Sequence, residues 1–433
     1  MNQTSNGPKS VEWAALTMGI FLTLSFGTLS LLSVVLAVLG LTSLPKLNTS
    51  EPLSLLILAL GLFGLALLLL PGIYLNGRKL FHLPDAQLTF PTINDQILIP
   101  AIVVTWLLTL AIGQQISSNQ TLSMLILPLA NLLATGLPIL LYVRISLRGL
   151  EFPSARRGWS IFGSSIIISP FLALIFEVIS VGAIFVLFMI YASFVPGLKD
   201  VLFTLGSAIT SESNNEAEMT RLVAKLFYAP GIAVAALAAF SLAIPLIEET
   251  FKLTVLWFYF GRIRRPLDGF VLGILCGAAF ALGENIGFTS AGAADWAASA
   301  VARSTSALPH IFNSGLLGWA LVSAWKEQRY GRLLGAFSAV LLVHGAWNAI
   351  SLGLALNTLT AYVAVVPFFL QSSLPWYAGW SLLALGAFGG LIFNNHQMRQ
   401  SLKNEPAAKL GYNRPLLSQT FGEKHDGSVE KSD

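Results

Sequence analysis

Long apolar runs limit what this chain can fold into. Stretches of about 20 apolar residues, each bounded by charged or turn-forming residues, recur along the sequence. A bilayer core is about 30 Å thick, and about 20 residues of α-helix cross it. Because lipid cannot satisfy free backbone N–H and C=O groups, segments of this length cross as helices. The chain is therefore predicted to be an all-α, polytopic transmembrane helix bundle.

About ten spans are predicted. They cover residues 13–42, 53–75, 97–113, 121–143, 159–195, 231–260, 269–289, 307–325, 332–354 and 376–394. The fifth exceeds one bilayer thickness, so we expect a helix that is tilted or is kinked at Pro170. Residues 361–374 are apolar but contain Pro367, and this sequence is compatible with a re-entrant or an interfacial segment.

Composition excludes several classes of protein. Hydrophobic residues make up 55% of the 433 and charged residues only 11%, which is far from an ordinary soluble domain. The net charge of +4 does not indicate nucleic-acid binding, because the basic residues fall in short loops between apolar runs. Cys276 is the single cysteine, so neither an intrachain disulfide nor a thiolate metal cluster can form.

The same basic residues predict the orientation. With both termini in the cytoplasm, 19 of the 25 Lys and Arg residues lie in inside segments and five in outside segments. Cytoplasmic segments of membrane proteins carry this excess. The sequence shows no targeting segment, so we expect a multi-pass protein of a plasma membrane, in a bacterial cell.

Five regions are expected along the chain. They are a cytoplasmic N-terminus (1–12), accessory helices with an external loop (13–228), a catalytic bundle (229–355), a re-entrant or interfacial segment with the last span (356–394), and a disordered cytoplasmic tail (395–433). The tail is polar, which disfavours a packed structure.

Charged side chains inside the predicted spans need a reason, since each costs at least about 2.5 kcal/mol to insert. Glu177 stands alone in the fifth span, and we interpret it as structural. A second group is concentrated in the following four spans: Glu248, Glu249, Lys252, Glu284, His310 and His344.

Depth counting predicts that this second group meets. Measured from the cytoplasmic edges of their spans, Glu248, Glu284, His310 and His344 lie at about 18 to 24 Å, for a rise of 1.5 Å per residue. This agreement is within about one helical turn and favours one layer toward the outer face. Asn348 shares a helix face with His344, four residues away. Together these residues form the candidate catalytic set.

Their local sequences resemble the PrsW family of intramembrane proteases, distant relatives of the CAAX-processing and bacteriocin-processing membrane proteases. The matching elements occur in order: EETFK (248–252), FALGEN (280–285) and HGAWN (344–348). They look like the family's EExxK, FxxxE and HxxxN elements and cover about residues 230–355. The resemblance implies cleavage of a membrane-protein substrate, in some relatives an anti-sigma factor.

Two mechanisms remain open for such a peptidase. In both, Glu248 activates water as the base, and Glu249 shares the proton or orients the water. In the metal-free version, His344 and Asn348 stabilise the oxyanion while Glu284 and His310 position water or substrate. In the metal version, Glu284, His310 and His344 hold a zinc ion, although no local HExxH pair is present.

Two other functions compete with proteolysis. Buried Glu and His residues also serve proton-coupled transporters and channels, but those distribute polar groups along a path through the bilayer. Here the charged groups form one layer. A catalytically idle scaffold is the third possibility, and retention of every motif element argues against it.

Overall fold

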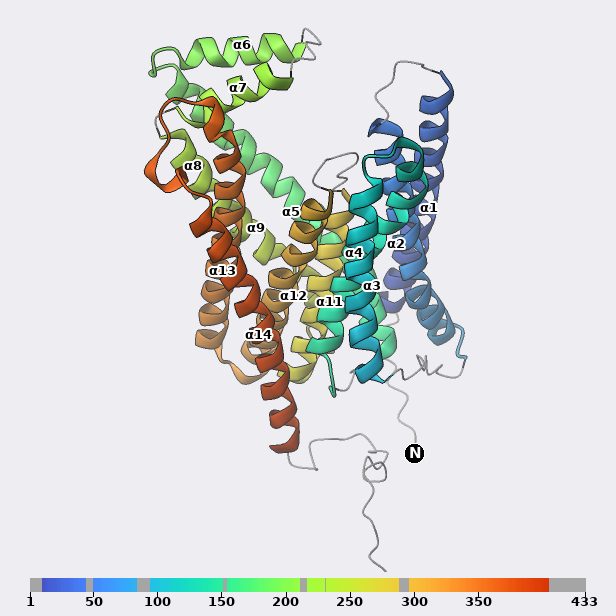
Figure 1. Ribbon diagram of the computed structural model, residues 1–433. Helices are drawn as coiled ribbons and strands as arrows, with labels where there is room; N and C mark the ends of the chain where they lie inside the picture. Colours follow the sequence, from blue (N-terminus) through green and yellow to red (C-terminus); the bar gives the residue numbers. More distant parts are fainter. Residues whose placement is uncertain are drawn as a thin grey trace, which may run out of the picture.

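The computed structural model describes residues 10–43, 50–83, 94–150, 154–210, 216–229, 231–287 and 296–404. Within these ranges every regular element is a helix (Figure 1), which confirms the predicted fold class. The predicted N-terminal segment before Ser10 and the tail after Asn404 lie outside the described residues.

The first half of the chain forms five long helices. They are α1 (Ser10–Ser43), α2 (Ser50–Leu80), α3 (Asp95–Ile116), α4 (Gln120–Ser146) and α5 (Ala155–Ala192). Helices α1 and α2 pack along each other, and α3 packs on α4. Helix α5 continues without interruption through Pro170 and crosses the bundle obliquely (Figure 1), as expected for a span longer than the bilayer.

A series of short helices follows α5. Helices α6 (Leu198–Thr210) and α7 (Glu216–Phe227) cap the end of the bundle opposite the termini (Figure 1). The next span is irregular and comprises α8 (Ile232–Ala238), the π-helix η1 (Ala239–Ala243), α9 (Ile244–Phe251) and α10 (Thr254–Trp257).

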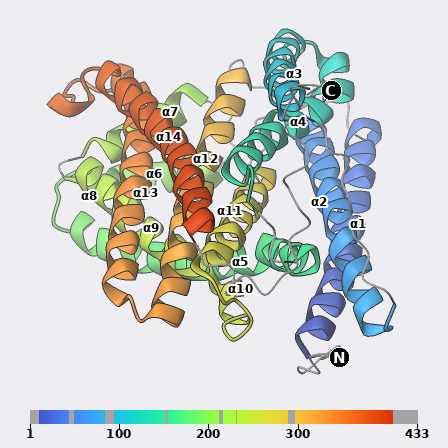
Figure 2. The same ribbon diagram turned by 90° about the horizontal axis from the view of Figure 1, so that it is seen from below.

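The remaining elements are α11 (Pro266–Gly287), α12 (Trp296–Glu327), α13 (Tyr330–Thr358), the 3-10 turns η2 (Leu359–Tyr362) and η3 (Phe368–Leu370), and α14 (Leu374–Asn404). Viewed from below, α11 and α12 occupy the middle, between the α1–α4 group and α13 with α14 (Figure 2). Helix α11 is almost entirely buried by its neighbours.

Nine helical segments among the described residues are long and apolar enough to cross a membrane. The predicted span 307–325 is the exception. It lies within α12, which has the required length but carries more polar side chains. Because α12 is packed between α11, α4, α13 and α14, these polar side chains are buried by protein and need not contact lipid.

Both ends of the described chain lie at the same end of the bundle (Figure 1). Glu12 on α1 pairs with Arg156 at 3.0 Å and Arg262 at 3.3 Å. Asn395 on α14 donates to the carbonyls of Ser146 and Arg148, both at 2.9 Å. These contacts agree with an even number of crossings.

The segment 361–374 joins α13 to α14 and contains the end of η2 and all of η3, and its re-entrant or interfacial position stays a prediction. Two expectations about boundaries change. Helix α14 extends ten residues beyond the predicted end at 394, and residues 395–404 are therefore helical rather than disordered. Helix α12 begins at Trp296, so Arg303 belongs to a helix instead of an outer loop.

Glycines allow α11 and α12 to pack closely. Gly269, Gly273 and Gly277 recur every four residues and form a stripe on one face of α11. A Cβ atom at these positions would overlap the backbone of α12 at Gly318, Ser314 and His310, respectively. This contact fixes the height of α12 against α11 directly below the candidate site.

Candidate active site

The Glu-Glu motif lies in α9, between two irregular turns of its span. Pro245 lacks an N–H group, so it cannot donate to the Ser241 carbonyl as an α-helical residue would. The π-helix η1 occupies this point, one turn before Glu248. Gly345 of α13 packs against the Ser241 carbonyl so closely that a Cβ atom would overlap it. The irregular turn thus brings α13 against α9.

Helix α9 ends just beyond the motif. The Lys252 N–H still donates to the Glu248 carbonyl at 2.8 Å, but regular helix resumes only at α10. The Lys252 carbonyl accepts a hydrogen bond from the Ser169 hydroxyl of α5 at 3.0 Å. A side chain from another helix therefore satisfies backbone that the break exposes, as buried membrane segments require.

The Lys252 ammonium lies at the centre of the cluster and is fully buried. Its Nζ is 2.7 Å from Glu249 Oε1, 3.3 Å from Glu248 Oε2 and 2.8 Å from His310 Nδ1. Nζ is also 4.7 Å from the centre of the Phe280 ring. The ammonium therefore neutralises charge on both acids of the motif, and its burial demands this pairing.

His344 is held by a carboxylate on one side. Its Nδ1 lies 2.8 Å from Glu249 Oε1, and its Nε2 lies 3.7 Å from Glu248 Oε2. The fully buried Asn313 amide donates to the same Glu249 oxygen at 3.2 Å and to the Val340 carbonyl at 3.3 Å. With Glu249 ionised, Nδ1 carries the proton, and the lone pair of Nε2 faces Glu248.

His310 has the same arrangement. Its Nε2 lies 2.9 Å from Glu284 Oε2, and the other Glu284 oxygen accepts from Arg303 at 3.1 Å. Its Nδ1 faces Lys252 and lies 4.0 Å from Glu248 Oε2. Each histidine thus carries an acid on one nitrogen and presents the other toward Glu248. This pattern orients imidazole rings at metal centres and at bases.

Glu248 is the acid that both histidines face. Its Oε2 is buried and makes no hydrogen bond among the described residues, although Lys252 lies within ion-pair distance. One ligand atom each from Glu248, His310 and His344 lies within 4.8 Å of the others, which could hold a metal ion. Glu284, the acid of the predicted metal set, lies on the opposite side of His310.

Asn348 is the predicted site residue that does not join the cluster. Its side chain donates to the Phe240 carbonyl in η1 at 3.1 Å. The carbonyl belongs to the π-helical turn, so Asn348 ties α13 to the segment that carries Glu248. In this structure the contact positions His344, one turn away, relative to the motif.

The structure therefore brings together six of the seven predicted residues and adds Arg303 and Asn313. Asn313 follows His310 by three residues and shares its helix face, a spacing that could have identified it. Arg303 was assigned to a loop because its helix was predicted to begin at 307.

The cluster lies near the middle of its helices. His344 is the fifteenth of the 29 residues of α13, and His310 is the fifteenth of the 32 residues of α12. Both helices extend beyond the predicted outer ends of their spans, α12 to Trp296 and α13 to Thr358. The height of the layer in the bilayer stays a prediction.

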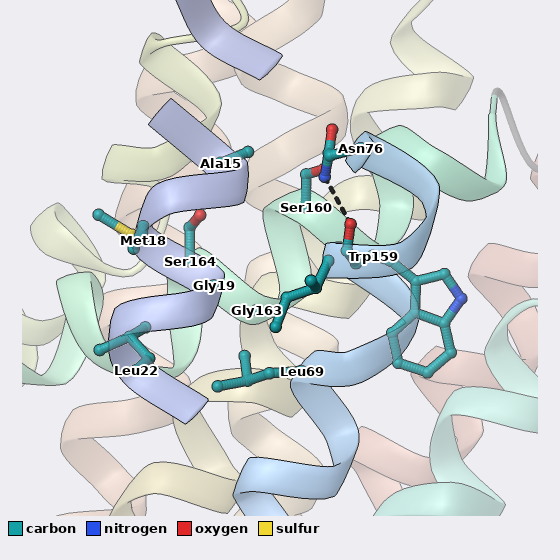
Figure 3. A pocket seen from close by; sticks show the side chains of 12 residues that line it. Ala15, Met18, Gly19, Leu22, Leu69, Asn76, Trp159, Ser160, Gly163 and Ser164 are labelled. Atoms are coloured by element: carbon teal, nitrogen blue, oxygen red, sulfur yellow. Dashed lines mark hydrogen bonds between the residues drawn. The ribbon is translucent and has the colours of Figure 1, made fainter. Parts of the chain in front are cut away.

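A separate cavity lies between α1, α2 and α5 (Figure 3). Small and apolar side chains line most of it, and Asn76 donates to the Ser160 hydroxyl there at 2.7 Å. None of its lining residues is an acid, a histidine or a lysine. It therefore offers no group for acid–base chemistry.

A helical membrane bundle with a buried layer of acids, imidazoles and one ammonium defines a polytopic membrane protein with an internal polar site. Residues 198–372 match the PrsW family intramembrane metalloprotease family. The resemblance predicted from the motifs is thereby confirmed for this segment. The match supports a peptide hydrolase of the membrane, with membrane proteins as its class of substrate.

The matched segment includes α6, α7, the four helices of the cluster and the connection before α14. It begins after α5, so α1 to α5 lie outside it. No match was found among curated proteins or among solved structures.

Proposed function

We propose that the chain is an intramembrane endopeptidase in which Glu248 activates the water that attacks the scissile peptide bond. The observation that carries this proposal is Oε2 of Glu248, which accepts no hydrogen bond from the described residues and faces two imidazoles that are each held by another acid. A base must accept a proton from water, and a carboxylate oxygen without a hydrogen-bond donor has that capacity.

The surrounding groups have separate tasks in this proposal. Glu249 and Glu284 hold His344 and His310 in fixed orientations. Lys252 pairs with both acids of the motif, and it presents positive charge near the reacting atoms. A nearby cation and an imidazole N–H would stabilise the oxyanion. The predicted oxyanion role of Asn348 would require its amide to leave the Phe240 carbonyl.

The donor set also fits a zinc ion by residue type. One carboxylate and two imidazoles are common zinc ligands, and acids on the outer nitrogens of both histidines are typical partners of such ligands. Glu248, His310 and His344 would hold the ion, in place of the predicted set with Glu284. An ion there would polarise the peptide carbonyl and activate water.

A metal ion and the Lys252 ammonium would, however, use the same ligand atoms. The ammonium lies within hydrogen-bond distance of His310 Nδ1 and within ion-pair distance of Glu248 Oε2. With a metal ion bound, the Lys252 ammonium would therefore have Glu249 as its main partner. For this reason both the metal-dependent and the glutamate-only mechanisms remain part of the proposal.

Cleavage of a panel of single-span membrane proteins tests the function. Wild type and Glu248→Gln are compared with and without a strong zinc chelator, and Glu327→Gln, which changes an exposed acid on α12, serves as the control. Glu248-dependent cleavage supports the proposal, and chelator sensitivity separates the two mechanisms. Absence of cleavage across the panel would favour the transporter or scaffold alternatives.

Zinc content measured by mass spectrometry separates the two ligand sets without relying on activity. Loss of bound zinc in Glu248→Gln but not in Glu284→Gln would support the set that includes Glu248. The reverse result would restore the predicted set with Glu284. If wild-type protein contains no zinc and is fully active, the metal-dependent mechanism is excluded.

The substrate and location are further parts of the proposal. An anti-sigma factor, suggested by the family resemblance, is a candidate substrate, and a bacterial plasma membrane is the proposed location. The basic loops favour an orientation with both termini inside. A cut in the outer half of the bilayer is the remaining prediction. Labelling of single cysteines on either side of the cluster by membrane-impermeant reagents would test the depth.

A further inference from the structure

Glu177 lies on the face of α5 that contacts α11. Ile166, Pro170, Ala173 and Glu177 follow a spacing of four, three and four residues and therefore share one helix face. The first two contact α11, because a Cβ atom at Gly283 would meet the Ile166 carbonyl at 3.0 Å and the Pro170 ring at 3.2 Å. Glu177 lies on the same face of α5, two turns beyond the point at which Pro170 contacts Gly283, the residue next to Glu284.

The helix is also fixed against α9 at this height. Phe176 stacks on Phe251 with ring centroids 4.6 Å apart, and Ser169 bonds the Lys252 carbonyl. Glu177 lies near enough to Glu248, Glu284, Lys252 and His344 for its charge to interact with theirs. The residue interpreted from sequence as structural is therefore a neighbour of the site.

No hydrogen bond or ion pair of the described residues involves the Glu177 carboxylate, and the side chain is only half-buried. A charge in a membrane helix without a partner is expensive, so such residues usually serve a ligand or an ion. The adjacent Val178 is 62% exposed and Phe185 is 56% exposed, so this part of α5 is open to the surrounding membrane.

We propose that Glu177 binds a cationic side chain of the membrane-spanning substrate and positions the substrate beside Glu248. This inference rests on the proposed function. A cation is the expected occupant because two acids, Glu248 and Glu284, and only one lysine, Lys252, lie near enough for their charges to act on the carboxylate. A second acid on the substrate would be repelled, whereas a Lys or Arg would supply the missing partner.

Peptide binding to an inactive enzyme tests the inference without cleavage. The full chain carrying Glu248→Gln is placed in lipid nanodiscs, with and without Glu177→Gln. The probes are single-span Leu/Ala peptides with one Lys in the outer half, moved over four consecutive positions, and matched peptides with Gln. We expect Glu177→Gln to weaken binding of the best Lys peptide about tenfold and to change binding of the Gln peptide less than twofold.

Two further variants make the result specific. Glu218→Gln removes an exposed acid on α7 and should leave both affinities unchanged. Glu177→Lys should reverse the preference, so that a peptide with Glu binds better than one with Lys. This reversal also shows that the variant protein is folded.

Equal weakening for Lys and Gln peptides, or no weakening for either, would overturn the inference. The two proposals fail separately. Charge-dependent binding without cleavage by the wild type would remove the proposed function alone. Glu248-dependent cleavage without charge-dependent binding would remove only the role of Glu177.

Discussion

Replacing Lys252 by Met tests whether paired charge holds the cluster together. The side chain is fully buried and contacts Glu249, Glu248 and His310 through its ammonium. Met retains most of the apolar stem, so the change removes mainly the charge. Removing one partner from a buried ion pair costs about 3 to 5 kcal/mol, because the remaining carboxylates lose their counter-charge.

A double-mutant cycle with Glu249→Gln isolates this contribution. Glu249 keeps its contacts with Asn313 and His344 in either background, so the two variants share mainly the ion pair. We expect Lys252→Met to lower the free energy of unfolding by about 3 to 5 kcal/mol, and the double variant to recover about 2 to 3 kcal/mol of the summed losses. Unfolding of purified protein with increasing SDS in mixed micelles measures each free energy.

The reasoning fails if the two losses simply add. Additivity would mean that Lys252 and Glu249 do not interact energetically despite their 2.7 Å separation. An unchanged free energy of unfolding for Lys252→Met would also contradict the reasoning, because loss of a buried ammonium that pairs with acids should destabilise the fold. Activity should disappear in both variants, whichever mechanism operates.

Three further substitutions have expected outcomes. Gly277→Ala should lower the free energy of unfolding by about 1 to 3 kcal/mol, because its Cβ would lie 2.5 Å from the His310 carbonyl oxygen of α12, whereas Gly335→Ala on α13, with open space around it, should be neutral or slightly stabilising in the same SDS assay. Asn348→Leu should lower kcat at least about tenfold by freeing the Phe240 carbonyl, and unchanged kcat would exclude the positioning role. Arg303→Gln should reduce kcat about tenfold by releasing Glu284, and a Lys at this position should recover part of the rate.

The layer of candidate site residues could be predicted because the sequence gives two quantities. Hydrophobic runs give the spans, and the distance of each charged residue from a span edge gives its height. These were sufficient to bring Glu248, Glu284, His310 and His344 together. Height says nothing about the direction in which a side chain points. The same argument therefore could not separate Glu284, behind His310, from Glu248, which faces both histidines.

Polar helices buried by protein are the second limit. Residues 297–306 of α12 are mostly small or polar, so hydropathy predicts a span that begins only at 307. Their hydroxyls lie against backbone carbonyls: the Ser304 oxygen is 2.6 Å from the carbonyl of Ala134 in α4 and 2.6 Å from that of Ala300, and its one hydrogen is shared between them. Neighbouring helices satisfy these groups, and only tertiary packing reveals it. The error moved Arg303 out of the site.

The boundary of the family match does not coincide with a boundary in the packing. Helices α4 and α5 lie outside residues 198–372, but both contact α11, and α4 also contacts α12. The Ser169 hydroxyl of α5 donates to the Lys252 carbonyl at the break in the helix. A chain that begins at residue 198 would leave that carbonyl without its donor and would expose the buried side of α11. We expect such a chain to aggregate or be degraded when expressed alone, and to recover solubility in detergent and activity when residues 1–197 are co-expressed. Full activity of the short chain by itself would show that α1 to α5 are dispensable. It would also remove the physical basis for any role of Glu177, because that residue would then be absent from an active enzyme.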